Sequence, residues 1–421
     1  MEQFIGILLP INNKRRIKLK QTEAGIYIHI PFCQRKCYYC DFISFPNQYH
    51  QQEKYITNLI QEIKAEKELL RQKEITTIYF GGGTPSSIES KWIQKVLSEL
   101  KAILGENKQR EVTLEINPGT VTKEKLLDYH KAGINRLSIG LQSADDTLLK
   151  QIGRIHTWND FKQTIQLISE IGFSNYNVDL MIGLPNQSIE NIKTSIDELL
   201  NLPLKPNHIS VYSLIVEEGT PIANQLERGC ITLPEEEEER TQYHYVKNRL
   251  ELAGYTHYEI SNFAKEGYMA KHNTNCWEQK EYFGFGVAAH SYLQGVRFSN
   301  TENLAKYLTQ NPSDWENQKI EKWIHTIDET KPFPQTRGIR TIHEKQTQNE
   351  QEKEYIMLGL RMLKGISISA FKEKFGQNPL YRFHQKWARL VKEELIEVDL
   401  DQIRLTSKGL DLANLVWEEF I

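Results

Sequence analysis

The sequence lacks several features that would place it in other classes of protein. Nowhere in its 421 residues do about 18 apolar residues follow one another, so we expect no segment that spans a membrane. The net charge of −3 gives no basic excess of the kind that nucleic-acid binders carry. With 39% hydrophobic and 25% charged residues, the composition is typical of a globular chain and excludes wholesale disorder. We therefore expect two or three globular domains and no nucleic-acid partner.

Cysteine is scarce as well. The chain has five, and three of them fall within eight residues: Cys33, Cys37, Cys40, Cys230 and Cys276. An odd number with one tight cluster does not resemble a disulfide framework. Free thiols are kept reduced in the cytoplasm, so we expect a cytoplasmic protein whose clustered cysteines serve chemistry.

The first 24 residues differ in composition from the rest. An apolar stretch at 4–11 is followed by five basic residues between 14 and 20. A secretory signal has the opposite order, and a transit peptide, which is the alternative, is normally rich in serine. No serine occurs before residue 25. We predict that 1–24 is a poorly ordered N-terminal extension.

From residue 25 to about 255, short β-rich runs alternate with longer amphipathic stretches. The predicted strands are 25–30, 76–80, 112–116, 136–141, 176–182 and 208–214, and the predicted helices are 49–70, 88–104, 122–132, 158–171, 188–200 and 234–253. Strands that alternate with helices form right-handed βαβ units and a parallel sheet. Six such units predict an α/β fold, a partial (β/α)6 barrel of the TIM type over 25–255.

The remainder of the chain divides into three parts. Residues 256–310 are predicted to extend the barrel, and 311–350, rich in Gln, Glu, Thr and Pro, to form a polar connection that is partly helical at most. Residues 351–421 follow an order of helices and a hairpin that is typical of a small winged-helix-like α+β domain. Such a domain often binds DNA, but fold does not give function, and no marked basic excess supports that activity here.

The cysteine cluster, C-x3-C-x2-C at Cys33, Cys37 and Cys40, indicates a metal site. Soft thiolates select zinc, copper(I) or iron–sulfur clusters. A structural zinc site needs four ligands, and His29 or Asp41 would have to supply the fourth. A [4Fe–4S] cluster held by three cysteines leaves one iron open, and an open metal position is typical of reactive sites.

Polar residues stand where successive predicted strands end. Three glycines and Thr84 follow the second strand, and glycines let a ligand approach the backbone closely. Glu115, Gln142 and Asp179 lie in or at the end of the next three strands. An acid in an apolar strand is costly unless it is paired or bound, and barrel folds place their sites at this end of the strands. Arg154 has the planar fork that suits a carboxylate, with a surface ion pair as the alternative.

These motifs, in this order, resemble the radical S-adenosylmethionine (SAM) superfamily. The flanking sequence, Tyr27-Ile-His29-Ile-Pro-Phe-Cys33, is similar to its porphyrin branch, which contains the oxygen-independent coproporphyrinogen III dehydrogenases and the HemW heme chaperones. The resemblance runs from about residue 25 to the C-terminus. It implies a [4Fe–4S] cluster on the three cysteines and a SAM site. The SAM residues that it implies are Tyr27, Gly82, Gly83, Thr84, Glu115, Gln142, Arg154 and Asp179, with Gln142 and Asp179 at the ribose and Glu115 and Arg154 at or near the amino-acid end.

Two positions distinguish the subfamilies. The dehydrogenases resemble C-x3-C-x2-C-x-C, whereas this sequence has Phe42 at the last position, as in the HemW type. Downstream, His272-Asn-Thr-Asn-Cys276-Trp277 is similar to the H-N-x-x-Y-W stretch that HemW proteins associate with heme, but Cys276 replaces the tyrosine. Histidine and cysteine both ligate heme iron, so His272 and Cys276 are the candidate heme residues. A hydrogen-bonded structural His272 is the alternative. The apolar, glycine-rich run 282–291 could cover a flat macrocycle.

The resemblance therefore implies a heme chaperone that binds heme and hands it to an acceptor hemoprotein associated with a membrane. An electron donor such as a flavodoxin or ferredoxin, and a homodimer, are compatible with it. No catalytic residue is assigned, and reductive cleavage of SAM stays open. The alternatives are a coproporphyrinogen III dehydrogenase, which Phe42 disfavours, and a radical-SAM methyltransferase on the same scaffold.

Overall fold

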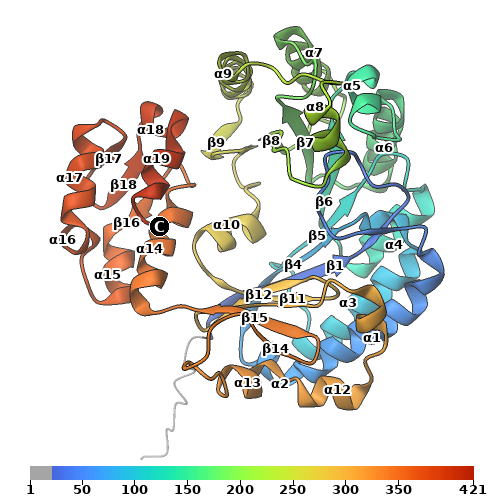
Figure 1. Cartoon of the computed structure of the whole chain (residues 1–421). Coiled ribbons are helices and arrows are strands. Elements are labelled where there is room, and N and C mark those ends of the chain that lie inside the picture. The colour runs from blue at the N-terminus through green and yellow to red at the C-terminus, as the bar shows by residue number, and fades with distance from the viewer. Residues whose placement is uncertain (1–20) are drawn as a thin grey trace, which may run out of the picture.

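The computed structural model describes residues 21–421, so the predicted N-terminal extension lies almost wholly outside the described residues. Its last two residues already belong to the first strand, β1 (Glu23–Ile30). In the part of the chain that is described, no helix is long and apolar enough to cross a bilayer. Figure 1 shows a curved sheet with helices on its outer side and a smaller C-terminal domain beside it.

The α/β part-barrel predicted from the sequence is confirmed. Within residues 21–421, six strands form its parallel portion, each beside the next in chain order: β1, β4 (Glu74–Gly82), β5 (Glu111–Ile116), β6 (Arg136–Gln142), β7 (Tyr176–Ile182) and β8 (His208–Ser213). Each differs from its predicted range by two residues at most at either end. The sequence predicts these strands because short runs rich in apolar and β-branched residues alternate with longer stretches of helical periodicity.

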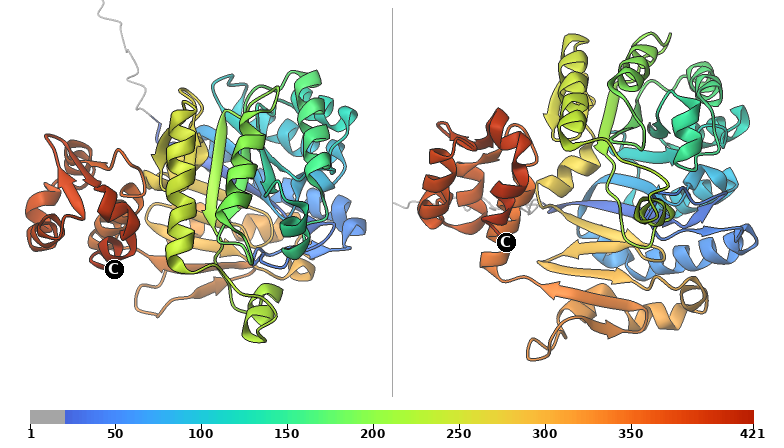
Figure 2. Two further views of the ribbon diagram at one scale, coloured as in Figure 1. Left: turned by 90° about the horizontal axis from the view of Figure 1, so that it is seen from above. Right: turned by 45° about the horizontal axis from the view of Figure 1, so that its top comes forward.

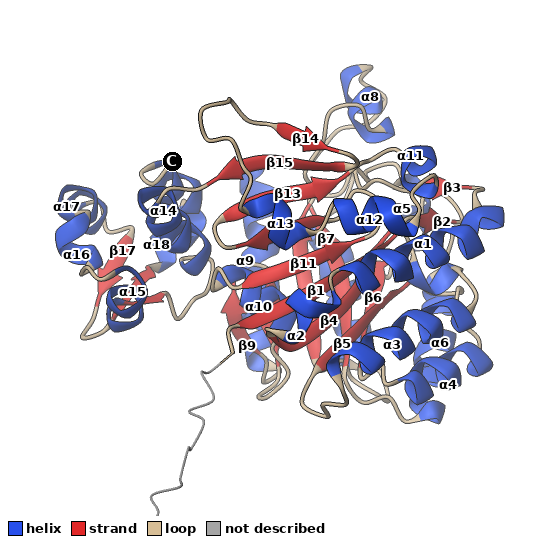
Figure 3. Cartoon of the chain, turned by 90° about the horizontal axis from the view of Figure 1, so that it is seen from below, coloured by secondary structure: helices blue, strands red, loops and turns tan. Residues whose placement is uncertain are grey.

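Helices cover the outer face of this sheet (Figure 3). They are α1 (Gln52–Ala65), α2 (Lys67–Arg71), α3 (Ser90–Leu104), α4 (Lys123–Ala132), α6 (Trp158–Ile171), α7 (Ile189–Leu200) and α9 (Glu236–Leu252). Two further short helices, α5 (Asp146–Gln151) and α8 (Pro221–Glu227), and the 3-10 turns η1 (Tyr49–Gln51) and η2 (Pro85–Ser87) lie in the connections between these elements. Thr157 and Ser188 begin α6 and α7 with capping boxes, which satisfy amide groups that a helix start leaves unpaired. The predicted helix 49–70 is wrong in one respect, because it is interrupted at Glu66.

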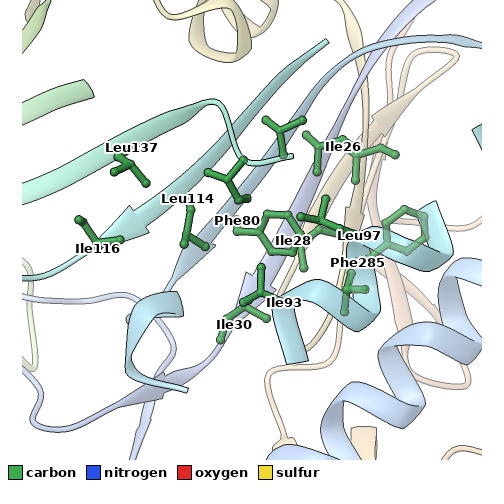
Figure 4. Close-up of a cluster of buried hydrophobic side chains, with 14 of the residues drawn as sticks. Ile26, Ile28, Ile30, Phe80, Ile93, Leu97, Leu114, Ile116, Leu137 and Phe285 are labelled. Carbon is green, nitrogen blue, oxygen red and sulfur yellow. The ribbon is translucent and has the colours of Figure 1, made fainter. Parts of the chain in front are cut away.

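The core between sheet and helices is formed by alternate residues of the strands. Ile26, Ile28 and Ile30 of β1 point outward and pack with Phe80 of β4, while Ile93 and Leu97 of α3 cover them (Figure 4). The intervening residues of β1, among them Tyr27 and His29, therefore face the inside of the barrel. The same alternation decides which side chains of every barrel strand are available to a ligand.

The sheet continues beyond the barrel on both sides. On one side lie β10 (Asn262–Ala264) and β9 (Thr256–Glu259), and on the other lie β11 (Glu281–Phe285), β12 (His290–Leu293), β13 (Val296–Asn300), β15 (Arg340–Lys345) and β14 (Gln335–Arg337). The first of the second group, β11, runs parallel to β1, and the pairs that follow it are antiparallel. The sheet therefore stays open, because its two outermost strands, β14 and β9, are not paired with each other.

Residues 311–350 differ from the polar connection that the sequence predicted. They supply β14 and β15 to the main sheet, and the short helices α12 (Pro312–Asn317) and α13 (Ile320–Ile324) follow α11 (Leu304–Leu308) across its outer face. Trp315, Ile320 and Trp323 in this stretch are buried in the main core. The segment is polar on average, but its few large apolar side chains pack into the core, and the average composition does not show this.

The C-terminal part is a separate α+β unit with its own core, as expected for a winged-helix-like domain (Figure 2). It comprises α14 (Gln348–Gly359), β16 (Ile366–Ser367), α15 (Ile368–Phe375), α16 (Pro379–Arg382), α17 (His384–Lys392), β17 (Ile396–Val398), β18 (Gln402–Leu405), α18 (Ser407–Asp411) and α19 (Ala413–Glu418). Its connection to the sheet is direct. The amide of Ile260 donates to Arg361 O (3.1 Å) and the amide of Leu363 to Tyr258 O (3.0 Å), so this stretch covers the edge of β9.

A buried ion-pair network joins α1 to β15, the strand next to the edge strand β14. Arg340 of β15 contacts the carboxylates of Glu62 (3.4 Å) and Glu66 (2.7 Å), and both Arg340 and Glu62 are at most 1% exposed. Glu62 also accepts hydrogen bonds from Tyr307 Oη (2.7 Å) and the amide of Gly286 (2.9 Å). Glu66 accepts the amide of Ile320.

We predict that Arg340→Met lowers the free energy of unfolding by about 3–5 kcal/mol, because it leaves two buried carboxylates without their cation. Urea unfolding followed by circular dichroism measures the change. The matched control is Arg389→Met, which removes exposed pairs with Glu393 and Glu419 and should leave the free energy of unfolding nearly unchanged. Equal, small losses in both variants would contradict the structural importance of the network.

Candidate functional site

The cysteine loop begins where β1 ends, and His29 holds it in place. The loop lies between two short paired strands, β2 (Phe32–Cys33) and β3 (Phe45–Pro46). His29 Nε2 donates to Ile43 O (2.9 Å), and its Nδ1 accepts from Tyr27 Oη (3.0 Å). Burial lowers the pKa of His29 to about 4, so the ring is neutral and both nitrogens are engaged. His29 therefore supports the loop and is not free to serve as a zinc ligand.

Tyr38 anchors the other side of the loop. Its amide donates to Ile152 O (3.0 Å), and its carbonyl accepts the amide of Ile222 (3.0 Å). The Tyr38 ring lies against Gly153, where an added Cβ would come within 2.9 Å of the ring and where φ is +79°. Glycine is required at that position on both counts.

The three cysteines lie on this loop above the barrel. Cys33 is buried, with its Sγ 3.5 Å from Thr84 Oγ1, and Cys37 Sγ accepts a hydrogen bond from Arg154 Nη1 (3.6 Å). Burial raises the pKa of Cys40 to about 11. Among the residues described, no three His, Cys, Asp or Glu side chains converge on a point that could hold a single metal ion.

Arg154 connects the loop to the ends of the strands. Its Nη2 donates to Asn117 Oδ1 (2.8 Å) and to the carbonyl of Gly140, while Asn117 Nδ2 donates to Thr84 Oγ1 (3.0 Å). Its Nε is buried without a partner among the residues described. Arg154 is thus not a surface ion pair. Together with Cys37, Thr84 and Asn117, Arg154 lines a small cavity below the loop.

Gln142 reaches the same place through an unusual backbone. Its φ is +75°, and the register between β6 and β7 shifts between Gly140 and Gln142. A Cβ on Gly140 would lie 3.0 Å from both Gln142 Nε2 and Asn117 Oδ1. The two amide side chains therefore converge beside Arg154. A non-glycine residue in the left-handed region costs about 1–3 kcal/mol and is characteristic of binding sites.

The glycine turn after β4 is packed more tightly than the sequence suggested. The amide of Gly82 donates to Glu115 Oε2 (3.2 Å), and that of Gly83 to Ile30 O (2.9 Å). A Cβ on Gly82 would come within 2.5 Å of the His29 ring, and one on Gly83 within 2.8 Å of Phe32 O. The glycines are thus needed so that the turn can pass under the cysteine loop.

Two half-buried carboxylates face the inside of the barrel. Glu115 accepts hydrogen bonds from Tyr79 Oη (2.8 Å) and from the amide of Gly82, and burial together with the nearby Asp179 raises its pKa to about 7. Asp179 accepts from Asn177 Nδ2 (2.7 Å), and burial raises its pKa as well. Tyr27 lies in the same space, where burial and Glu115 raise the pKa of its phenol. Two neighbouring acids inside the barrel are poised to receive a cation.

The structure thus gathers the residues that the sequence assigned to SAM at one end of the barrel. Cys37, Thr84 and Arg154 line the cavity, and the Gln142 side chain lies beside Gly140 together with that of Arg154. Glu115 contacts the glycine turn through the amide of Gly82. Tyr27 and Asp179 lie deeper. Sequence reasoning missed partners of these residues, namely Tyr79, Asn117, Ser138 and Asn177. Their signal was available, since each is polar and faces inward in or directly after a barrel strand.

The two candidate heme residues lie at the opposite end. They belong to α10 (Lys271–Trp277), a helix whose first amides, those of Lys271 and His272, donate to the carboxylate of Glu111 (3.1 Å each). Glu111 is the first residue of β5, so α10 crosses the amino ends of the barrel strands, whereas the cysteines stand at the carboxyl ends. In Figure 1, α10 lies between the sheet and the C-terminal domain.

His272 is directed into the barrel. Its Nδ1 is 2.8 Å from Thr77 Oγ1, its ring stacks on Tyr79 at 5.1 Å, and burial lowers its pKa to about 4. The ring is therefore neutral, with Nε2 as the nitrogen available to a metal. Burial raises the pKa of Cys276 to about 11. Tyr79 stacks in turn on Tyr27 at 6.3 Å, so a column of aromatic rings links the two ends of the barrel.

The expectation that 282–291 covers a macrocycle is wrong for its large side chains. Phe283 and Phe285 are fully buried in the core beneath the sheet, because β11 pairs with β1 and shares its outward alternation. His290 is exposed and stacks on His343 at 5.4 Å.

The comparisons with known proteins agree with this geometry. The sequence profile of the Radical SAM superfamily matches residues 27–199, and that of the HemN C-terminal domain matches residues 346–412. The chain is 34% identical to the heme chaperone HemW of Lactococcus lactis subsp. lactis (strain IL1403), over 95% of this chain and 98% of the relative. It is 37% identical to the heme chaperone HemW of Bacillus subtilis (strain 168), over 94% and 98%.

A solved structure shares the fold over most of its length. Coproporphyrinogen III oxidase (HemN) from Escherichia coli superposes with a TM-score of 0.78 at 21% identity, and the match covers 95% of this chain and 90% of that one. At this identity the likeness establishes the fold alone. The full-length relatives above 30% identity establish the family: the chain belongs to the heme chaperone HemW family within the radical SAM superfamily.

Proposed function

We propose that the protein is a heme chaperone that binds heme and transfers it to an acceptor hemoprotein, and that it carries a [4Fe–4S] cluster and exchangeable SAM. The observation that carries this proposal is the similarity to HemW chaperones over nearly the whole length of both chains. Phe42 supports the proposal, because it occupies the position of the fourth cysteine in the C-x3-C-x2-C-x-C pattern that the dehydrogenases resemble. Phe42 is 63% exposed at the edge of the cysteine loop.

The residues present fit both cofactors. Cys33, Cys37 and Cys40 would hold three irons of the cluster, and a buried thiol loses its proton when it binds a metal. SAM carries a sulfonium and an ammonium group, both cationic, and Glu115 and Asp179 are the half-buried acids that would compensate them. The remaining donor of Arg154 would receive the SAM carboxylate. When bound together, cluster and SAM supply the radical chemistry of the superfamily.

The chaperone role defines the partners. Heme would bind at His272 and Cys276 of α10, apart from the cluster, and the acceptor would be a hemoprotein, most simply one associated with a membrane. A flavodoxin or ferredoxin would serve as electron donor if the cluster is reduced, and a homodimer is compatible with this arrangement. A coproporphyrinogen III dehydrogenase or a methyltransferase on the same scaffold is disfavoured by the full-length similarity to HemW proteins.

One preparation tests the function. Anaerobically reconstituted protein is titrated with heme, assayed for SAM cleavage, and incubated with coproporphyrinogen III, SAM and a strong reductant. We expect stable heme binding and no protoporphyrinogen IX, since a phenylalanine ring cannot replace a thiol in hydrogen bonding or redox chemistry. Multiple turnovers of coproporphyrinogen III, or absence of heme binding, would overturn the assignment.

We predict that reconstituted protein holds about four irons per chain, as the cluster type requires. Cys33→Ala should lose this iron, because Cys33 is one of three ligands. The control is Cys230→Ala, which changes an exposed cysteine far along the chain from the loop and should retain it. Iron content and the visible absorption of the cluster give the result. Tightly bound zinc in place of iron in the native protein would refute the cluster.

We predict that SAM affinity rises as the pH increases through about 7 and then levels off. Burial and Asp179 hold the pKa of Glu115 at about 7, so below that pH its carboxyl is protonated and cannot compensate the SAM ammonium. Equilibrium dialysis at several pH values measures the effect.

In the same assay Glu115→Gln should abolish the pH dependence, and Asp179→Ala should weaken binding by about 1.5–3 kcal/mol, the range for hydrogen bonds to charged groups. Glu124→Gln, on the surface of α4, is the control. If Glu115→Gln retains the full pH dependence, a different group titrates and the placement is wrong.

We predict that His272→Ala shifts or abolishes the Soret band of the heme complex, because Nε2 of His272 is the nitrogen that its contact with Thr77 leaves available. Cys33→Ala should leave the band largely intact, since the cysteine loop stands at the other end of the barrel. His290→Ala serves as a control with an exposed histidine. Unchanged spectra and affinity in both His272→Ala and Cys276→Ala would place the heme elsewhere.

A further inference from the structure

Arg361 stands between two tryptophans where the C-terminal domain meets the sheet. It follows α14, and its carbonyl pairs with the amide of Ile260 at the edge of β9. Its guanidinium carbon is 4.4 Å from the centre of the Trp277 ring and 5.3 Å from that of Trp417. The three side chains come from different elements: Trp277 ends α10, Trp417 belongs to α19, and Arg361 lies in the connection between α14 and β16. The tryptophans therefore fix the plane of the guanidinium.

This guanidinium has no polar partner. In residues 21–421 it forms neither a hydrogen bond nor an ion pair, and its Nε is buried without an acceptor. Burial lowers the pKa of Arg361, which is the direction expected for a cation that is desolvated but not compensated. Arg340, by contrast, is buried with two carboxylates. An arginine that is stacked, oriented and unpaired is arranged to receive an anion.

Glu259, the acid whose charge acts most strongly on Arg361, does not pair with its guanidinium. Glu259 lies close enough for its charge and that of Arg361 to influence each other, together with Tyr212. One oxygen of Glu259 accepts from the side chain of Asn262 and the amide of Ser261 (3.0 Å), while the other is buried without a partner. Burial raises the pKa of Glu259, which weakens the negative charge that it could offer. The guanidinium therefore stays available on its outer side, where the residue is partly exposed.

We propose that Arg361 binds a propionate of heme, with Trp277 and Trp417 holding the guanidinium in the plane that a carboxylate requires. The proposal rests on the heme-binding function proposed above and adds to it a recognition residue from the C-terminal domain. Trp277 is adjacent to Cys276 and five residues from His272, about 7.5 Å along the helix axis. The iron of a porphyrin is at its centre and the propionates are at its rim, so a heme whose iron is held on α10 would carry its propionates away from that ligand, and Arg361 beyond the end of the helix is the cation we propose for one of them.

The experiment compares heme with its dimethyl ester, in which both propionates are methylated and uncharged. The wild-type chain should bind free heme at least about tenfold more tightly than the ester, in keeping with hydrogen bonds to a charged group. Arg361→Met, which retains the length and the apolar stem between the tryptophans, should lose that preference. Arg361→Lys should retain part of it, because the charge remains and the bidentate fork does not. Arg389→Met, an exposed arginine of the same domain, is the control and should behave like wild type.

Each outcome decides between the possibilities. Equal affinity of the wild-type chain for heme and ester would overturn the propionate site and leave the chaperone function standing. Full preference retained by Arg361→Met, in a variant with native circular dichroism, would also overturn it. If the wild-type chain binds neither form, the proposed function fails and this site fails with it.

Discussion

The two hydrogen bonds of the His29 ring fix the cysteine loop to the barrel, and the arrangement of the site depends on them. One bond fixes Ile43 at the end of the loop, and the other fixes Tyr27 inside the barrel. His29 is itself held by its carbonyl, which accepts from Tyr55 Oη (2.7 Å), and that hydroxyl also receives the amide of Val287. A loop with three thiols could adopt many conformations. These contacts place it directly above the carboxyl ends of the parallel strands.

The two candidate sites lie at opposite ends of the barrel. At the carboxyl ends of the strands, the cysteines, Arg154 and the half-buried acid Glu115 form a site suited to a metal cluster and a cationic cofactor. At the amino ends, α10 closes the opening and carries His272 and Cys276. If heme binds at α10 as proposed, the barrel would keep the macrocycle away from the cysteine loop.

Much of the fold could be predicted from the sequence, because the outward faces of the parallel strands are continuous apolar runs and the inward polar residues interrupt them at regular places. What failed depended on contacts between distant residues. Glu66, where the predicted helix is interrupted, pairs with Arg340, which lies 274 residues later, and no local pattern predicts that contact. The sequence suggested that Phe283 and Phe285 could contact a ligand, but β11 pairs with β1 and both side chains therefore point into the core. Likewise, the sequence does not show that Arg361 lies between Trp277 of α10 and Trp417 of α19, because these three residues are far apart in the chain.

The most direct measurement of the central claim is heme transfer. Purified protein loaded with one heme is mixed with increasing concentrations of an apo-hemoprotein whose heme complex has a distinct Soret band, and the spectrum is followed over time. A chaperone predicts transfer at a rate that rises with acceptor concentration and exceeds that from heme-loaded serum albumin. Transfer that is independent of acceptor concentration and no faster than simple dissociation would contradict a chaperone and leave only a heme-binding protein.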